Sequence, residues 1–460
     1  MKVLFCSSEV LPFVKTGGLA DVSGSLPIAL EKLGVDIRIA MPKYKGIDKK
    51  TATIGKNINV HFIENDTYFV RDALYGDRNG DFPDNLDRFA YYSRKTLELL
   101  KELNFKPDII HSNDWQCALI PIYLKNIFIK DEFYKDIKTI FSIHNLAYQG
   151  IFSKEGFPRL GLDRGLFNIN GLEYYDKINL MKGAIIFSDI VTTVSPTYAK
   201  EIQTEEYGCG LNGLLTEHSK KIFGILNGLD YNLWNPAKDK IIAKRYSFSM
   251  LRDKYINKIN LQNEAGLEVN EDIPLFGLIS RLVDQKGLDI LAGCLSEMLK
   301  RPLQFILLGT GEERYHRIFE EAKRNHPNKV SVTLGYDAVL AQKIYAGSDI
   351  FLMPSRYEPC GLGQIISLKY GTVPLVRKTG GLADTIVDVT ENPNTGNGFV
   401  FTEYSSSALL NTIDRVLSFY SDRIAWKSVI QRGMNADFSW KASAKKYLEL
   451  YINLTSIKYK

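Results

Sequence analysis

The stretch KTGGLAD occupies residues 15–21, directly after the first apolar run of the chain, and the same seven letters recur at residues 378–384. Adjacent glycines let backbone amides approach a ligand closely, and the Leu-Ala-Asp that follows is typical of the first turn of a helix, whose N-terminus favours anions. A single copy would more often be an ordinary turn between a strand and a helix. The repetition predicts two similar half-molecules, each presenting this loop to something held between them.

The composition is that of a large globular protein. With 460 residues, 45% of them hydrophobic, the chain is too long for one core and is expected to form two or three domains. Its 58 basic and 53 acidic residues are dispersed, which argues against a nucleic-acid or membrane surface. The net charge of +5 is compatible with an anionic small-molecule ligand.

Cysteine usage and hydropathy indicate the cellular location. The five cysteines are widely spaced and lack Cys-x-x-Cys spacing, which argues against disulfides and zinc and for a reducing compartment. No window approaches about 18 apolar residues, and the first residues resemble a strand rather than a signal peptide. We therefore expect a cytoplasmic protein that spans no membrane.

Short apolar runs alternate with segments of helical period along the chain. In the first half the apolar runs lie at residues 3–5, 36–41, 109–111, 139–144, 190–195 and 222–226. In the second half they lie at residues 275–280, 305–308, 330–334, 350–354 and 373–376. This pattern predicts an α/β fold of two doubly wound, Rossmann-like parallel sheets, the first domain over residues 1–235 and the second over residues 236–440.

Two segments depart from this alternation. Residues 440–459 carry aromatic and apolar side chains at helical spacing, which predicts an amphipathic helix. This helix, over residues 441–460, either belongs to the second domain or crosses back to the first as part of a hinge. Residues 66–87 lack periodicity and are rich in turn formers, so they are expected to form a long loop, either a lid or a plain surface insertion.

Polar residues able to bind a ligand gather directly after the apolar runs. In the first half these residues are Glu9, Asp114, His144, Asn145 and Asn227, and in the second half they are Arg281, Lys286, Tyr336, Glu358, Cys360 and Gly361. Each one alone has an ordinary structural explanation, such as a helix cap or a histidine at the edge of a core. Because open α/β sheets bind ligands at the carboxyl ends of their strands, the shared placement predicts two binding edges that face each other across a deep cleft.

The candidates of the second half suit an anionic leaving group. Arg281 and Lys286 supply positive charge, and the helix after the Glu358 loop adds about half a charge at its N-terminus. Together they could neutralise most of a diphosphate without a metal ion. The chain has no Asp-x-Asp, the usual carboxylate pair for a metal-bound nucleotide sugar. We expect neither a metal nor a cofactor, and we expect His144, Asp114, Asn227 and Glu358 to bind a neutral polyhydroxyl group.

At this point the chain resembles the bacterial glycogen synthases and the plant starch synthases, which are retaining GT-B glycosyltransferases. The resemblance covers essentially the whole chain. It rests on both KTGGLAD copies and on SE at residues 8–9, NDW at 113–115, HNLAYQG at 144–150, TVSPTY at 193–198, LNG at 226–228, SRL at 280–282, QKG at 285–287 and PSRYEPCGL at 354–362.

The resemblance implies transfer of glucose, with retention, from ADP-glucose to the non-reducing end of an α-1,4-glucan, releasing ADP, in glycogen biosynthesis. It places Lys15 and Gly18 near the donor phosphates, Arg281 and Lys286 on the pyrophosphate and Tyr336 on the base. The further implied contacts are Glu9, Asp114, His144, Asn145, Asn227, Glu358, Cys360, Gly361, Leu362, Gly363, Gly380 and Gly381. Catalytic roles are implied for Glu358, His144, Lys286, Arg281 and Lys15.

Two departures from the related families bear on this expectation. Gly363 stands where relatives usually carry threonine, so only its amide can act near the phosphates. Ile366 stands where many retaining GT-B enzymes place a second glutamate, which favours the glycogen synthase group over enzymes that use UDP- or GDP-sugars.

Other functions remain alternatives. The first is a retaining glycosyltransferase that uses UDP-glucose or another acceptor, and the second is a non-catalytic glucan-binding protein. A nicotinamide dehydrogenase would need Gly-x-Gly-x-x-Gly after the first strand, and that turn holds only the paired glycines.

Overall fold

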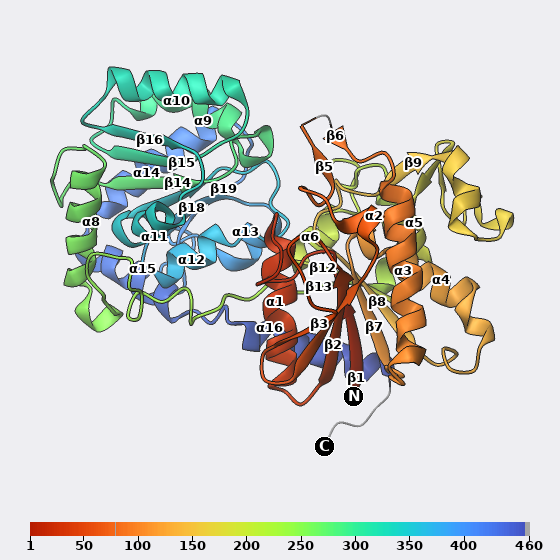
Figure 1. The fold of residues 1–460 in the computed structure, drawn as a ribbon. Coiled ribbons are helices and arrows are strands. Elements are labelled where there is room, and N and C mark those ends of the chain that lie inside the picture. Colours follow the sequence, from red (N-terminus) through yellow and green to blue (C-terminus); the bar gives the residue numbers. More distant parts are fainter. Residues whose placement is uncertain (79, 456–460) are drawn as a thin grey trace. The chain divides into compact units, whose positions relative to one another are not determined.

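The computed structural model describes residues 1–78 and 80–455, and the chain divides into two compact units. Unit 1 comprises Met1–Gly228 together with Trp440–Lys460, and unit 2 comprises Leu229–Ser439. Each unit is built on a largely parallel sheet with helices packed against it (Figure 1). Unit 2 is therefore inserted into the sequence of unit 1.

The sheet of unit 1 has eight strands, and every neighbouring pair is parallel except the edge pair β3 and β4. In spatial order the strands are β13 (Ile222–Gly224), β12 (Ile190–Thr193), β8 (Lys138–Ile143), β7 (Ile109–Asn113), β1 (Lys2–Cys6), β2 (Asp36–Pro42), β4 (Ile58–Ile63) and β3 (Thr51–Ile54). The order reverses at β1, because the chain adds β2 and β4 on one side and β7 on the other. This is the arrangement of a doubly wound fold.

The helices of unit 1 follow the strands. They are α1 (Gly18–Glu31), α2 (Asp66–Phe69), α3 (Asn85–Glu102), α4 (Leu119–Asn126), α5 (Leu180–Phe187), α6 (Pro196–Glu201), α7 (Asn212–Glu217) and α16 (Trp440–Thr455). Two small antiparallel sheets add β5 (Gly76–Asp77) with β6 (Gly80–Asp81), and β9 (Ile151–Ser153) with β11 (Lys177–Asn179) and β10 (Glu173–Tyr174).

The C-terminal helix α16 belongs to unit 1. The Ser443 hydroxyl donates a hydrogen bond of 2.6 Å to the Leu226 carbonyl oxygen. The Tyr451 hydroxyl lies 2.7 Å from Nδ1 of buried His111 in the middle of β7. These contacts, with the packing of α16 beside α1, fasten the helix to the sheet. The sequence prediction of an amphipathic helix is confirmed up to Thr455, and residues 456–460 lie outside the described part of the chain.

The sheet of unit 2 is entirely parallel. In spatial order its strands are β16 (Val330–Leu334), β15 (Gln304–Gly309), β14 (Leu275–Ile279), β17 (Ile350–Met353), β18 (Val373–Arg377) and β19 (Phe399–Phe401). The order again reverses at the first strand, here β14. The helices are α8 (Arg252–Glu264), α9 (Leu288–Met298), α10 (Glu313–Asn325), α11 (Ala338–Gly347), α12 (Gly363–Lys369), α13 (Gly380–Thr385), α14 (Ser406–Tyr420) and α15 (Arg423–Asn435).

The apolar runs became buried strands for a simple reason. Helices cover both faces of a parallel sheet, so its strands have no solvent side and need continuous apolar sequence. In β1 the residues from Val3 to Cys6 are all fully buried, and the same holds for Phe276 in β14. The fold class predicted from the sequence is confirmed. The edge strands β3 and β19, and β4 next to β3, were missed because their sequences alternate or are short.

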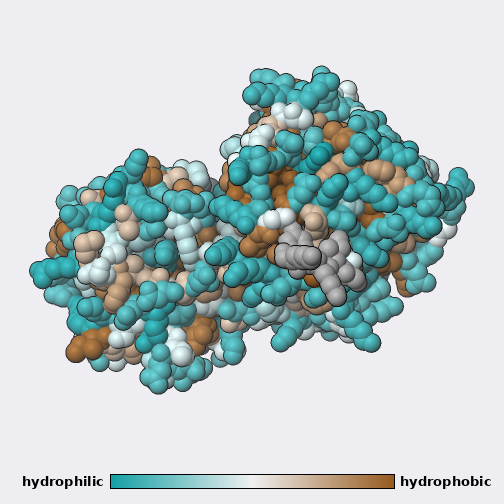
Figure 2. Space-filling model, turned by 90° about the horizontal axis from the view of Figure 1, so that it is seen from below, coloured by the Kyte–Doolittle hydropathy of each residue, from teal (hydrophilic) through white to brown (hydrophobic). Residues whose placement is uncertain are grey.

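Residues 66–87, which were predicted to form a long loop, contain regular secondary structure. They hold α2 and the β5–β6 hairpin before α3 begins at Asn85. In the described residues no helix is long and apolar enough to cross a membrane. Hydrophilic residues dominate the face shown in Figure 2, with apolar residues scattered among them.

Candidate active site

In both units several of the candidate residues follow the strands at which the strand order reverses. In unit 1, Glu9 and the first KTGGLAD copy come after β1, and Asp114 comes after its neighbour β7. In unit 2, Arg281 and Lys286 come after β14, and the loop with Glu358 comes after its neighbour β17. The crevice outside such a reversal point is where open α/β sheets bind ligands.

The first KTGGLAD copy is shaped by Glu9. The buried Glu9 carboxylate accepts hydrogen bonds from the amide and the hydroxyl of Thr16, both at 2.5 Å, and from the Gly17 amide at 3.3 Å. Helix α1 then begins at Gly18. A Cβ added to Gly17 or Gly18 would meet no described atom within 4 Å. The glycines therefore leave open space beside the helix start, which is what a ligand approaching the backbone requires.

The amine of this loop is also positioned. Lys15 Nζ lies 2.8 Å from Asp21 Oδ2, which belongs to the first turn of α1, and the Lys15 side chain remains half-exposed. An exposed ion pair of this kind contributes little to stability. Lys15 is accordingly free to exchange its partner for a ligand anion at small cost.

Tyr75 is a residue that the sequence analysis missed. Its hydroxyl donates to Glu9 Oε1 at 2.7 Å and lies 2.8 Å from the Ser8 hydroxyl. Tyr75 immediately precedes the β5–β6 hairpin, so this contact ties the 66–87 segment to the KTGGLAD loop. The sequence of that segment has no periodicity, so the presence of a tyrosine was its only sign of a contact with Glu9.

Asp114 and His144 are brought together after β7 and β8. The His144 amide donates to Asp114 Oδ1 at 2.8 Å, and His144 Nε2 lies 2.9 Å from Asn113 Oδ1. Asp114 adopts φ of +55°, a conformation that costs a non-glycine residue free energy and is concentrated at functional sites. The side chain of Asp114 therefore fixes the start of the HNLAYQG run in place. Asn113 belongs to the NDW run at residues 113–115, and the sequence did not predict it as a partner of His144.

Burial shifts the pKa values of this pair in opposite directions. Desolvation, assisted by the negative charge of Glu9, raises the pKa of Asp114 to about 7. Desolvation lowers the pKa of His144 to about 4. The imidazole is therefore neutral at pH 7, while the carboxyl exchanges its proton near that pH.

Asn227 carries an unsatisfied group. The residue is only 9% exposed, and its buried Oδ1 atom has no hydrogen-bond partner in the described residues. An unpaired buried carbonyl costs about 1–3 kcal/mol. A hydroxyl-bearing ligand would satisfy it. Asn145, by contrast, uses its side-chain oxygen locally, accepting from the Ala147 amide at 3.0 Å.

In unit 2 the central contact is an ion pair. Lys286 Nζ lies 2.6 Å from Glu358 Oε2, and the Glu358 side chain is only 8% exposed. The Ser355 hydroxyl donates to the same oxygen at 3.1 Å. Ser355 was not predicted as a site residue, although it lies in the quoted PSRYEPCGL run. The pair brings a cation and a hydrogen-bonding carboxylate to one point.

The two other candidates of this unit are exposed. The Arg281 guanidinium donates a hydrogen bond of 3.2 Å to Gln285 Oε1 and forms no ion pair within the described residues, so its charge is available. Tyr336 follows β16, two strands from β14 in the sheet, and is 90% exposed. An aromatic ring so exposed can stack on a planar group. The structure does not bring Tyr336 into contact with Lys286 or Glu358.

The second KTGGLAD copy serves a different purpose from the first. A Cβ on Gly380 would lie 2.0 Å from the Glu358 carbonyl oxygen, and a Cβ on Gly381 would lie 2.0 Å from that of Cys360. The Gly381 amide donates to the Glu358 carbonyl at 3.0 Å. These glycines therefore let α13 pack directly on the loop that carries Glu358. The two copies have the same seven residues but pack differently.

The loop from Cys360 to Gly363 leads into α12. Gly361 has φ of +70°, which favours glycine, and Gln364 Nε2 donates to the carbonyl oxygens of Cys360 and Gly361 at 3.0 and 3.1 Å. Cys360 is buried, and Leu362 precedes the first residue of α12, Gly363. Within residues 1–78 and 80–455 no group of three His, Cys, Asp or Glu side chains could hold a metal ion.

Comparison with known families identifies both halves of the chain. Residues 2–217 match the model of the starch synthase catalytic domain, and residues 261–430 match that of glycosyl transferases group 1. Similar curated proteins are a glycogen synthase of Geotalea daltonii, 50% identical, and one of Thermosipho melanesiensis, 47% identical. Each alignment covers 98% of both chains.

Solved structures give the same result. The catalytic domain of starch synthase IV from Arabidopsis thaliana, bound to ADP and acarbose, is similar with a TM-score of 0.90 and 35% identity over 99% of both chains. A sucrose-phosphate synthase from Thermosynechococcus elongatus has a TM-score of 0.65 at 16% identity over 99% of both chains, which speaks for the fold alone. The fold is GT-B, with two Rossmann-like domains.

Proposed function

The chain belongs to the glycogen synthase family, and from that premise we propose that it transfers glucose from ADP-glucose to the non-reducing end of an α-1,4-glucan, with retention and with release of ADP. Both family models describe glycosyltransferases, so the chain is a hexosyltransferase. The ADP in the starch synthase IV structure supports the adenine nucleotide as leaving group, and the acarbose supports a glucan-like acceptor.

We assign the binding of the leaving diphosphate to unit 2. Arg281 and Lys286 are cations on the loop after β14, and Lys286 is held by Glu358 at 2.6 Å. A diphosphate arriving at this loop would add a second anionic partner to Lys286 and a first one to Arg281. We assign Tyr336 to the nucleotide base because its ring is 90% exposed.

The loop after Glu358 would hold the transferred glucose. Glu358 is a buried hydrogen-bond acceptor, and the backbone of Cys360, Gly361, Leu362 and Gly363 runs past it into α12. We assign these backbone groups to the sugar and the phosphates. Gly380 and Gly381 support this loop from behind through their close packing on Glu358 and Cys360.

In unit 1 we assign Lys15 and Gly18 to the donor phosphates, since Gly18 leaves its amide approachable and Lys15 is exposed. Glu9 holds the loop that presents them. We assign Asp114, His144, Asn145 and Asn227 to sugar hydroxyls. The unpaired Oδ1 of Asn227 is the feature that a hydroxyl would satisfy directly.

The mechanism we propose is a front-side displacement. The C1–O bond to the diphosphate breaks as the acceptor hydroxyl attacks the same face of C1, and the hydroxyl proton passes to the departing phosphate oxygen. Positive charge from Lys15, Arg281 and Lys286 would stabilise that oxygen as it gains charge. Trapping a covalent glucosyl-enzyme would contradict this mechanism.

The single observation that carries the proposal is the ion pair of Lys286 with buried Glu358 beside the point where the strand order reverses. The decisive experiment measures initial rates with ADP-glucose and UDP-glucose, each with a glycogen primer. Faster turnover of ADP-glucose supports the proposal. Preference for UDP-glucose would favour the alternative of a retaining GT-B enzyme with another donor, and glycogen binding without turnover would favour a non-catalytic glucan-binding protein.

We further propose a cytoplasmic location. All five cysteines are free thiols, which suits a reducing compartment. Cell fractionation followed by immunodetection tests this location directly.

A further inference from the structure

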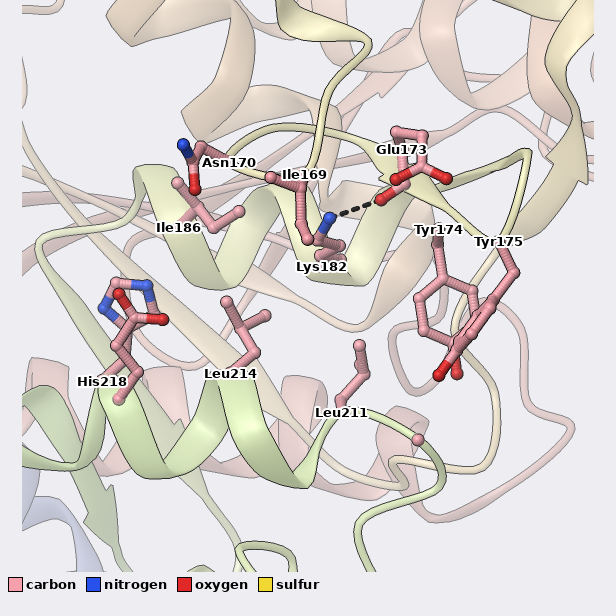
Figure 3. A pocket seen from close by; sticks show the side chains of 12 residues that line it. Ile169, Asn170, Glu173, Tyr174, Tyr175, Lys182, Ile186, Leu211, Leu214 and His218 are labelled. Atoms are coloured by element: carbon pink, nitrogen blue, oxygen red, sulfur yellow. Dashed lines mark hydrogen bonds between the residues drawn. The ribbon is translucent and has the colours of Figure 1, made fainter.

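Unit 1 holds a pocket that contains none of the predicted site residues. It has a volume of about 660 Å³ and lies between the β10–β11 hairpin, α5 and α7. In Figure 3, Tyr174 and Tyr175 stand together at one end, His218 lies at the other, and Leu211 and Leu214 lie between them. Its volume is within the range of about 300–1,000 Å³ found for ligand sites.

The aromatic end of the pocket is exposed and strained. Tyr175 is 80% exposed, and its ring meets that of Tyr174 edge to face at a centroid distance of 4.7 Å. Tyr175 and Asp176 form the two-residue turn of the hairpin with φ of +50° and +61°, where glycine or asparagine would be less strained. The chain thus retains a large aromatic side chain in an unfavourable, solvent-exposed position, which packing does not explain.

The pocket is joined by a short chain of hydrogen bonds to the HNLAYQG run, which carries two of the residues assigned to sugar hydroxyls. The Cys209 carbonyl oxygen accepts from the Tyr174 hydroxyl at 3.3 Å and from Gln149 Nε2 at 3.0 Å. Gln149 lies in the run that begins at His144, and its Oε1 accepts from Asn179 at 2.6 Å, at the start of α5. The pocket and the HNLAYQG run are therefore parts of one bonded framework.

The charges that line the pocket disfavour an anion. Glu173 and Glu217 contribute two carboxylates. Desolvation lowers the pKa of Lys182, whose ammonium donates to the Glu173 carbonyl oxygen, and lowers that of His218 further below neutrality. With His218 uncharged, the lining carries two negative charges against one positive charge. A phosphate-bearing donor does not fit this balance, whereas a neutral ligand with hydroxyl groups does.

We propose that this pocket is a second binding site for the α-1,4-glucan acceptor, in which Tyr175 and Tyr174 receive a sugar ring and the polar rim bonds its hydroxyls. The inference rests on the proposed function only for the identity of the glucan. A long acceptor chain held here and at the HNLAYQG run would be bound at two points. The second contact raises its effective concentration at the first.

The test compares Tyr175→Ala with Ile424→Ala, a control that truncates a side chain 83% exposed in unit 2. Migration in native gels containing glycogen measures binding without requiring turnover. We expect about five- to tenfold weaker glycogen binding for Tyr175→Ala, as for the loss of one aromatic contact, and no change for Ile424→Ala. The kcat with ADP-glucose stays unchanged while the KM for glycogen rises.

Unchanged glycogen retardation of Tyr175→Ala would overturn the proposal. A change of oligomeric state in light scattering with glycogen binding intact would also overturn it, because the tyrosines would then belong to an interface between copies of the chain. If glycogen binding falls as expected but ADP-glucose is not turned over, the pocket stands and the proposed function fails.

Discussion

Gly363, the first residue of α12, packs against the ring of Phe351 in β17. A Cβ added to Gly363 would lie 2.8 Å from Cε1 of Phe351 and 3.3 Å from Sδ of Met353. Phe351 is fully buried, so its ring has little room to move. Position 363 is glycine where the family resemblance implies threonine, and the ring of Phe351 occupies the space that a threonine side chain would need.

We therefore predict that Gly363→Thr is destabilising by about 1–3 kcal/mol, the usual cost of overpacking a core. The double variant Gly363→Thr with Phe351→Leu should recover part of that loss, because the smaller side chain makes room. Urea denaturation of the wild type, both single variants and the double variant gives the coupling energy. Additive effects would show that the two positions do not compete for space.

Removal of the Lys286 ammonium should affect turnover strongly. We predict that Lys286→Ala lowers kcat by about 10²–10³, since one group that stabilises a leaving anion contributes on that scale. The matched control is Lys343→Ala, which removes a partly buried lysine paired with Glu264 at 2.7 Å in the same unit. Circular dichroism should show both variants folded. An unchanged kcat for Lys286→Ala would contradict its assignment to the diphosphate.

Asn227 should be important for activity and dispensable for stability. Replacing it with alanine removes a buried oxygen that has no partner in the described part of the chain, so the free energy of unfolding should stay level or rise. Turnover should fall if a substrate hydroxyl bonds that oxygen. The control is Asn257→Ala, because the Asn257 side chain bonds the amide and carbonyl of Lys244 at 3.1 and 2.7 Å and its loss should lower the melting temperature.

The pH dependence of stability should carry opposite contributions from Asp114 and His144. The pKa of Asp114 is raised to about 7, so the folded protein binds the extra proton, and this contribution to stability, complete below about pH 4, is lost as the pH rises through 7. The pKa of His144 is lowered to about 4, so its contribution is complete above about pH 6.5 and is lost as the pH falls through 4.

Each substitution should therefore remove one of the two contributions to the pH dependence of stability. His144→Gln should unfold at lower pH than the wild type, and Asp114→Asn should lose less stability between about pH 4 and 7. Urea midpoints measured across pH 4–8 for the three proteins check both signs. Identical pH profiles for Asp114→Asn and the wild type would show that the carboxyl titrates normally.

The sequence predicted the sheets well because buried parallel strands require continuous apolar runs, and β1, β7, β14 and β17 all show them. It also predicted that Lys286 and Glu358 follow strands at the ligand-binding edge of the second sheet, and in the structure the two side chains form an ion pair. The packing of the second KTGGLAD copy was not predicted, since the close approach of α13 to Glu358 at Gly380 is a tertiary distance.

Contacts from irregular segments were beyond sequence reasoning for the same reason. Tyr75 reaches Glu9 from a segment without periodicity, and Ser355 reaches Glu358 by the local path of its loop. The half-buried Tyr174 and the exposed Tyr175 became notable only through the left-handed turn and the pocket beside it.

The place of α16 has a consequence for how the molecule is made. All of unit 2 lies between Gly228 and Trp440, so a ribosome finishes that unit before it delivers the helix that meets His111 and Leu226. The nascent first unit must wait with those positions uncovered, whereas unit 2 is a continuous segment that can fold as soon as it emerges. Helix α16 thus completes the fold of unit 1 last, and the inserted unit 2 is the part of the chain able to fold first.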